Sequence, residues 1–130
     1  MTRSPLTLAA AAILTLAASP ALAHPKLLSA SPAAGGVSGP TSRLTLHFSE
    51  PLVAKFSGAD LTATSMMMGG KPMAGVMKVG GVSPSLEAGD PKTLVLTLKA
   101  PLSAGTYRLD WHAVSTDTHR VKGAYSFTVE

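Results

Sequence analysis

The 130-residue sequence contains no cysteine. This absence excludes thiolate zinc sites, iron–sulfur clusters, cysteine nucleophiles and disulfides, so stability must come from an apolar core alone. Aromatic residues are also scarce, at 5% of the chain, and the 11 Lys and Arg residues are dispersed without a basic run. Scattered cations with few aromatics between them argue against nucleic-acid binding.

The common enzyme motifs are missing as well. The chain contains no G-x-S-x-G, no H-E-x-x-H and no glycine-rich phosphate loop. Serine, histidine and aspartate are all present, but no motif ties a serine to a base. We therefore expect a protein that is not an enzyme and has no catalytic residues.

The first 23 residues have the pattern of a secretory signal peptide. Arg3 supplies a positive charge, residues 6–18 form an apolar run that is short for a membrane span, and Ala21-Leu22-Ala23 is an A-x-A cleavage site. An uncleaved N-terminal anchor is the alternative. We expect cleavage before His24, a mature domain of residues 24–130, and a soluble product exported to the periplasm in a bacterium with two membranes.

Six segments of the mature region, separated by proline and glycine, have strand patterns. Apolar residues alternate with polar ones at 43–48, 93–98, 106–112 and 123–129, and weaker strand signals lie at 26–29 and 58–64. No window has a sustained helical period. Gly105 precedes Tyr107 by two residues, which resembles the tyrosine corner of immunoglobulin-like sandwiches. The pattern predicts an all-β, immunoglobulin-like Greek-key sandwich or small barrel with about seven strands.

Three connecting regions are less regular. Residues 31–40, SPAAGGVSGP, are expected to form a loop. Leu52, Val53 and Phe56 lie in a connector that we expect to cover the core. Residues 65–90 hold five of the six methionines and six of the twelve glycines, with few β-forming residues. We expect a pair of loops there, around a weak strand near residues 76–79.

The stretch 110–120, DWHAVSTDTHR, concentrates the groups that could bind a metal. Asp117 and His119 are two residues apart, so an extended backbone would place both side chains on one face. Cleavage would make His24 the N-terminal residue, whose amine and Nδ1 can chelate a metal together. Pro25 has no amide N–H to compete as a further ligand. Such nitrogen and oxygen donors favour Cu(II). The alternative is a frayed terminus beside ordinary loop residues.

The methionines form a second candidate site. Thioethers are soft ligands that select Cu(I). Five methionines lie within twelve residues: Met66, Met67, Met68, Met73 and Met77. The alternative is a mobile loop with one or two methionines packed inside.

The other polar residues have ordinary interpretations. His47 and His112 fall on outward strand positions, where a histidine is more often solvated than ligating, although His112 could support the nearby metal ligands. Asp110 is expected to pair with Arg108, Arg120 or Lys122. The Glu50-Pro51 pair is typical of a turn at a strand end.

The mature sequence resembles the CopC family of periplasmic copper-resistance proteins. The resemblance rests on HPKLLSASPA, LHFSEPLV, KFSGADL, the methionine-rich segment, GDPKTLVLTL and PLSAGTYRLDWHAVSTDTHRVKGAYSFTV. It implies a small Greek-key β-barrel that carries copper without catalysis. It also implies a Cu(II) site at His24, Asp117 and His119.

The resemblance further implies Cu(I) binding by the methionine loop and partners in copper handling. Some family members bind Cu(I) with the help of a histidine in that loop, but no histidine lies near Gly69-Gly70-Lys71 here. The candidate Cu(I) ligands that remain are Met66, Met67, Met68 and Met73, and Met77 is peripheral. Partners of the family include an inner-membrane copper-uptake protein and a multicopper oxidase. The competing functions are a copper-dependent oxidase that uses the N-terminal histidine and a metal-free immunoglobulin-like interaction module.

Overall fold

The computed structural model describes residues 24–68 and 71–130, which form two β-sheets packed face to face. The four-stranded sheet has the order β1 (Leu27–Ser31), β3 (Arg43–Phe48), β7 (Asp90–Thr97), β6 (Ser83–Glu87). The five-stranded sheet has the order β2 (Val37–Ser38), β9 (Arg120–Val129), β8 (Gly105–Val114), β4 (Gly58–Met68), β5 (Lys71–Lys78). Only the β2–β9 pair is parallel. In both sheets, several strands that are neighbours in space are not consecutive in the sequence, so the connections cross between the sheets. This topology confirms the all-β, immunoglobulin-like sandwich, with nine strands in the described residues instead of about seven.

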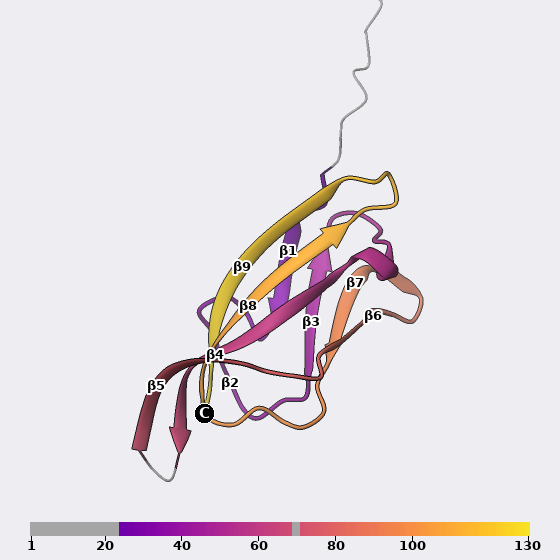
Figure 1. Cartoon of the computed structure of the whole chain (residues 1–130). Coiled ribbons are helices and arrows are strands. Elements are labelled where there is room, and N and C mark those ends of the chain that lie inside the picture. Colours follow the sequence, from indigo (N-terminus) through magenta and orange to yellow (C-terminus); the bar gives the residue numbers. More distant parts are fainter. Residues whose placement is uncertain (1–23, 69–70) are drawn as a thin grey trace, which may run out of the picture.

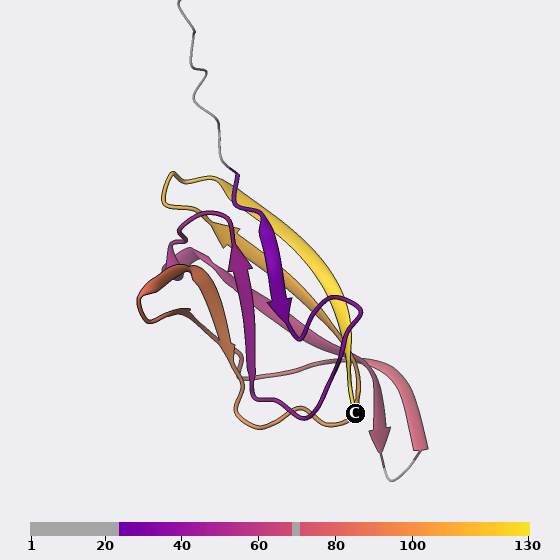
Figure 2. The ribbon, with the colours of Figure 1, turned by 180° about the vertical axis from the view of Figure 1, so that it is seen from behind.

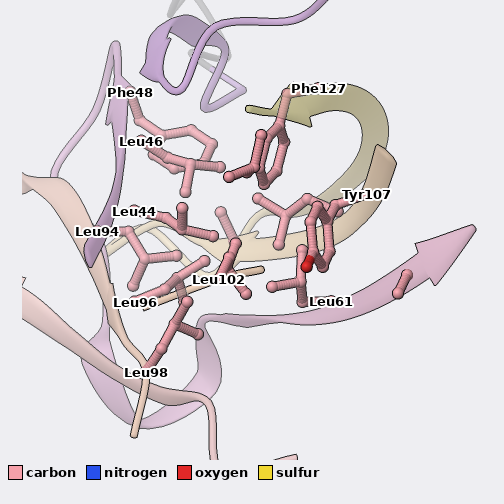
Figure 3. Packing of buried hydrophobic residues seen from close by; sticks show 14 of the residues in the cluster. Leu44, Leu46, Phe48, Leu61, Leu94, Leu96, Leu98, Leu102, Tyr107 and Phe127 are labelled. Atoms are coloured by element: carbon pink, nitrogen blue, oxygen red, sulfur yellow. The ribbon is translucent and has the colours of Figure 1, made fainter. Parts of the chain in front are cut away.

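The core lies between the sheets and is built by the alternating segments that the sequence predicts. In the register of β3 against β7, Leu44 faces Leu96 and Leu46 faces Leu94, and all four side chains are fully buried. Figure 3 shows these leucines meeting the aromatic rings contributed by β8 and β9. Because full burial of one such side chain contributes about 1.5–3 kcal/mol, this layer can stabilise the fold without disulfides. The buried apolar residues of the core cluster are Leu44, Leu46, Phe48, Leu52, Leu61, Ala63, Leu94, Leu96, Leu98, Leu102, Tyr107, Leu109, Ala113, Phe127 and Val129.

The tyrosine corner predicted from Gly105 and Tyr107 is present. The hydroxyl of Tyr107 donates a hydrogen bond of 2.7 Å to the carbonyl oxygen of Ser103, four residues upstream. The ring itself is almost fully buried and stacks on Phe127. This bond ties the turn before β8 to the core.

The prediction of a loop pair at residues 65–90 is wrong for most of the segment, although the weak strand expected near residues 76–79 overlaps the end of β5. The pairing of β4 with β8 continues past a bulge between Ala63 and Ser65 as far as Met66, and β5 then pairs with β4 along the methionine segment. Residues 83–87 form β6 on the other sheet, paired with β7. Backbone pairing with an established neighbouring strand therefore outweighs the poor intrinsic β-propensity of glycine and the unclear pattern of the methionines.

Two smaller expectations also change. Leu52 is buried as predicted, but Phe56, in the short 3-10 helix η1 (Ala54–Phe56), is 56% exposed and does not cover the core. The segment 31–40, expected to be a loop, contains the short strand β2. No helix in the described part of the chain is long and apolar enough to cross a membrane.

The two candidate sites lie at opposite ends of the sandwich. In Figure 1 the start of the described chain, before β1, and the connection between β8 and β9 are both at the upper end. The β4–β5 hairpin projects from the lower end, and Figure 2 shows the same separation from behind. The fold thus brings the N-terminal histidine toward the D-x-H segment and keeps the methionines apart from both.

Candidate metal centre

The connection between β8 and β9 is a tight turn that holds Asp117 and His119. The amide of Ser115 donates to the carbonyl of His119 at 2.9 Å, and the amide of Thr118 donates back to Ser115 at 2.9 Å. Thr118 has φ 75°, a left-handed conformation that is strained for a β-branched residue. Strain of this kind persists where the surrounding structure enforces it, and it often marks a functional site.

Asp117 and His119 meet within this turn. The Oδ2 atom of Asp117 lies 3.1 Å from Nδ1 of His119. This Nδ1 atom is buried and has no well-aligned hydrogen bond among the described residues. The hydroxyl of Ser115 donates to Oδ1 of the same carboxylate. The Ser115 hydroxyl, followed by the His119 imidazole, lowers the pKa of Asp117 to about 2, so this carboxylate is ionised at neutral pH.

The N-terminal segment is fastened beside this turn. Lys26 and Ser49 exchange two hydrogen bonds of 2.9 Å, one from each backbone amide, and Pro25 is buried. This anchoring brings the imidazole of His24 to the ring of His119. The ring centroids are 4.7 Å apart and the planes meet edge to face at 79°. The three residues predicted as Cu(II) ligands therefore lie at one end of the fold.

A short segment after β3 connects the two halves of this site. Its Ser49 bonds to Lys26 of the N-terminal segment, and the carbonyl of its Pro51 accepts a bond of 3.1 Å from the amide of Thr116. Glu50 lies between these two residues and is half-buried. The sequence predicts only a turn at Glu50, because the flanking long-range bonds leave no local signal in the sequence.

The side chains alone do not complete a metal cage. Among the described residues, no three His, Asp or Glu side chains come close enough together to hold a metal ion. Asp117 and His119 provide one adjacent pair of donor atoms. His24 is near, but in the full chain its backbone nitrogen is part of a peptide bond to Ala23. His24 could add two further donors, a free α-amine and a ring nitrogen. Both would require cleavage before His24 and a rotation of its exposed ring.

The methionine segment is a β-hairpin instead of a loop. Its register places Met66 opposite Met73 and Met67 opposite Pro72. The side chain of Met66 is half-buried against the core and lines a pocket of about 280 Å³ together with Met77, whose own side chain is 60% exposed. The side chains of Met67, Met68 and Met73 lie outside the described residues.

The remaining polar candidates are distributed over the sheets. Asp110 forms an ion pair with Arg108 at 3.2 Å, which is one of the pairings predicted. His112 lies with its ring against Gly58 on the outer side of the five-stranded sheet. His47 is exposed as predicted but bonds to Thr93.

Comparison with known proteins places the chain in a family. The CopC domain model matches residues 27–130. Copper resistance protein C of Pseudomonas syringae pv. tomato is 49% identical over 111 residues, which cover 85% of this chain and 83% of that protein. Copper resistance protein C of Escherichia coli is 46% identical over 112 residues, 85% and 84% of the two chains.

A solved structure agrees with these sequence matches. The crystal structure of PcoC, a methionine-rich copper resistance protein from Escherichia coli, superposes with a TM-score of 0.72 at 44% identity, over 83% of this chain and all of that one. These relatives are named as copper resistance proteins and not as enzymes, in agreement with the missing catalytic motifs. The chain therefore belongs to the CopC family.

Proposed function

We propose that this chain is an exported copper-binding protein that carries or buffers copper and contributes to copper homeostasis and resistance. Its relatives are named copper resistance proteins. In this proposal Cu(II) binds at His24, Asp117 and His119, and Cu(I) binds at the methionine hairpin.

The observation that supports the Cu(II) site best is the 3.1 Å separation between Oδ2 of Asp117 and Nδ1 of His119. Nitrogen and oxygen ligands commonly bind divalent metals at about 2.0–2.1 Å. Two such ligands at a right angle are then roughly 2.8–3.0 Å apart, as simple trigonometry on those bond lengths requires. The two donors are thus spaced as neighbouring ligands of a tetragonal Cu(II) ion. The carboxylate is already ionised, and it brings a negative charge that a divalent ion neutralises.

Removal of residues 1–23 would supply the missing donors. A free amine at His24 together with the Nδ1 atom of the same residue can close a six-membered chelate ring. An α-amine has a pKa of about 7.7–8.0, so competition from a metal near neutral pH can deprotonate it. The His24 ring already lies against His119. The chelate and the Asp117–His119 pair would then provide four donors around one ion.

The Cu(I) proposal rests on the hairpin register. Met66 and Met73 are directly opposed on β4 and β5, a position at which side chains on neighbouring strands come closest together. Met67 and Met68 continue the same strand. Thioethers select Cu(I) over hard ions, and the hairpin contains no histidine to stiffen the site. A site of thioethers alone would exchange its ion more readily.

The partners and the compartment follow from the same proposal. The signal-peptide pattern directs the protein to the periplasm. There it would transfer copper to an inner-membrane copper-uptake protein, and it would act alongside a multicopper oxidase. Two sites at opposite ends of the sandwich would allow each oxidation state to be delivered at a separate surface (Figure 1).

The test is equilibrium dialysis of protein isolated after export against Cu(II), and separately against Cu(I) under reducing conditions, with metal analysis of the retained protein. We expect one tightly bound equivalent of each ion. Absence of retained copper would favour the metal-free interaction module. Turnover of an added reductant and O₂ well above that of free copper would favour the copper-dependent oxidase, and so would also contradict the carrier.

A further inference from the structure

A chain of three polar side chains lies outside both copper sites proposed above. Nδ1 of His47 and Oγ1 of Thr93 are 2.8 Å apart, and the same hydroxyl donates to Oδ2 of Asp90 at 2.5 Å. His47 and Thr93 are direct partners in the register of β3 and β7. Their neighbours Leu46 and Leu94 point into the core, so this chain lies on the outer face of the four-stranded sheet.

The position of each proton in this chain follows from the donors and acceptors. The hydroxyl of Thr93 and the backbone amide of Lys92 both donate to Asp90, and these bonds lower the pKa of its carboxyl group. Asp90 is therefore ionised and can only accept. Because the single proton of Thr93 is given to Asp90, the hydroxyl oxygen must accept from His47. The neutral imidazole of His47 thus carries its proton on Nδ1, and its Nε2 has a free lone pair.

We propose that Nε2 of His47 is a separate, monodentate binding site for a borderline divalent metal ion of the Cu(II) type. A histidine that binds a metal usually donates its other ring N–H to a carboxylate or another acceptor, which fixes the tautomer and the ring and raises the basicity of the ligand. The bonds to Thr93 and Asp90 have this arrangement. Thr93 is only 2% exposed, so it holds the ring from a fixed position, whereas the imidazole itself is exposed.

The site is open because one protein ligand leaves the other coordination positions to water or to an incoming ligand. A metal bound this way exchanges quickly and can form a mixed complex with a second donor molecule. His47 belongs to β3 of the four-stranded sheet and pairs with Ser29 of β1, whereas the D-x-H turn connects β8 and β9 of the five-stranded sheet.

His112 is the internal comparison. It is also a histidine on an outer strand position, but its ring rests against Gly58 and has no hydroxyl–carboxylate pair behind it among the described residues. If any accessible imidazole sufficed, the two histidines would bind metal equally. If the Thr93–Asp90 support matters, His47 binds more tightly.

The test is nuclear magnetic resonance of protein isolated after export and labelled with ¹⁵N. Long-range ¹⁵N–¹H spectra of the imidazole rings report the tautomer, and titration with Cu(II) broadens the signals of each histidine that binds it. We expect the Nδ1–H tautomer at His47 and broadening of its ring signals at lower Cu(II) than at His112. The signals of His119 and His24 report binding at the proposed main site separately. Absence of binding at one site can therefore be distinguished from absence of binding at the other.

Four variants complete the test. H47Q should abolish the broadening on this face. T93V should raise the Cu(II) concentration required by about 10- to 100-fold, the usual effect of losing such a supporting group. Thr93→Ser keeps the hydroxyl and should restore the response. Where T93V fails to fold, D90N removes the charge and should weaken the response in the same direction. An Nε2–H tautomer, equal broadening at His47 and His112, or an unchanged response in the variants would overturn the proposal.

Discussion

Oδ2 of Asp117 and Nδ1 of His119 are 3.1 Å apart in a turn that also holds a threonine in a left-handed conformation. The two donors belong to residues two positions apart, and the turn keeps them on the same side. The Ser115 hydroxyl fixes the other carboxylate oxygen. The pair is thus held in place by local hydrogen bonds, which would reduce the ordering required if a metal binds there.

Replacing either member of this pair should weaken Cu(II) binding strongly. We expect Asp117→Asn and His119→Gln each to raise the Cu(II) dissociation constant by more than the 10- to 100-fold typical of a supporting residue, because each removes a direct ligand. Competitive titration with a chelator of known affinity measures the change. H112Q is the matched control, because this histidine lies outside the turn and should leave the tight site unchanged. Unchanged affinity in both ligand variants would refute the assignment.

Cu(I) binding at the hairpin should depend on the opposed methionines. We expect Met73→Leu to weaken Cu(I) binding at least about tenfold, a loss of about 1.4 kcal/mol, because leucine keeps the volume but lacks the sulfur. Met77→Leu is the control, since Met77 pairs with Ala63 farther from the hairpin end. Titration against a chromogenic Cu(I) chelator gives both values. Equal losses in the two variants would contradict a defined site at Met66 and Met73.

The hydroxyl of Tyr125 is buried and has no hydrogen-bond partner in the described part of the chain. A buried polar group without a partner costs about 1–3 kcal/mol. We therefore expect Tyr125→Phe to leave the free energy of unfolding unchanged or to raise it by about 1 kcal/mol. Urea unfolding measures the difference. The comparison is Tyr107→Phe, which removes the bond to Ser103 and should destabilise the fold by a similar amount.

The same burial predicts a pH dependence. Burial raises the pKa of Tyr125 to about 12, against a usual value of 10. The unfolded chain therefore loses this proton first, and between about pH 10 and 12 the folded state binds more protons than the unfolded one. Stability should fall as the pH rises through this window, and less steeply in Tyr125→Phe. Spectrophotometric titration should find a tyrosine that ionises late, and equal slopes for both proteins would contradict the prediction.

A glycine on β9 makes room for the only tryptophan. A Cβ atom at Gly123 would lie 2.5 Å from Cζ2 of Trp111, and this rigid indole packs edge to face on Phe48. We expect Gly123→Ala to destabilise the fold by about 1–3 kcal/mol through overpacking and to shift the fluorescence of Trp111. Gly39→Ala is the control, because no atom lies within 4 Å of its Cβ position. Its stability should change by no more than about 0.5 kcal/mol.

The fold could be predicted largely because the core strands alternate clearly. The pattern of residues 43–48 matches β3 in both bounds and buried side chains. The hairpin of β4 and β5 could not be predicted, because its pairing depends on a distant strand and its methionines and glycines carry no strand period. Phe56 was misassigned for a related reason, since hydrophobicity alone does not reveal which side of a connector faces the core.

The candidate sites were predictable to different degrees. The spacing of Asp117 and His119 predicts that they lie close together, and the cleavage pattern singles out His24. The approach of His24 to the Asp117–His119 turn depends on Ser49 and Pro51. Their hydrogen bonds to Lys26 and Thr116 are long-range and leave no local signal in the sequence. The link between His47 and Thr93 likewise spans 46 positions along the chain.

The central claim is that a free amine at His24 completes the Cu(II) site. The direct test is a Cu(II) titration followed by electron paramagnetic resonance, on protein that begins at His24 and on a version with one alanine added in front. The account predicts tight tetragonal binding by the first protein and its loss in the second, because the added residue converts the amine into a peptide nitrogen. Equal binding with the same spectrum would contradict the account and would place the copper elsewhere.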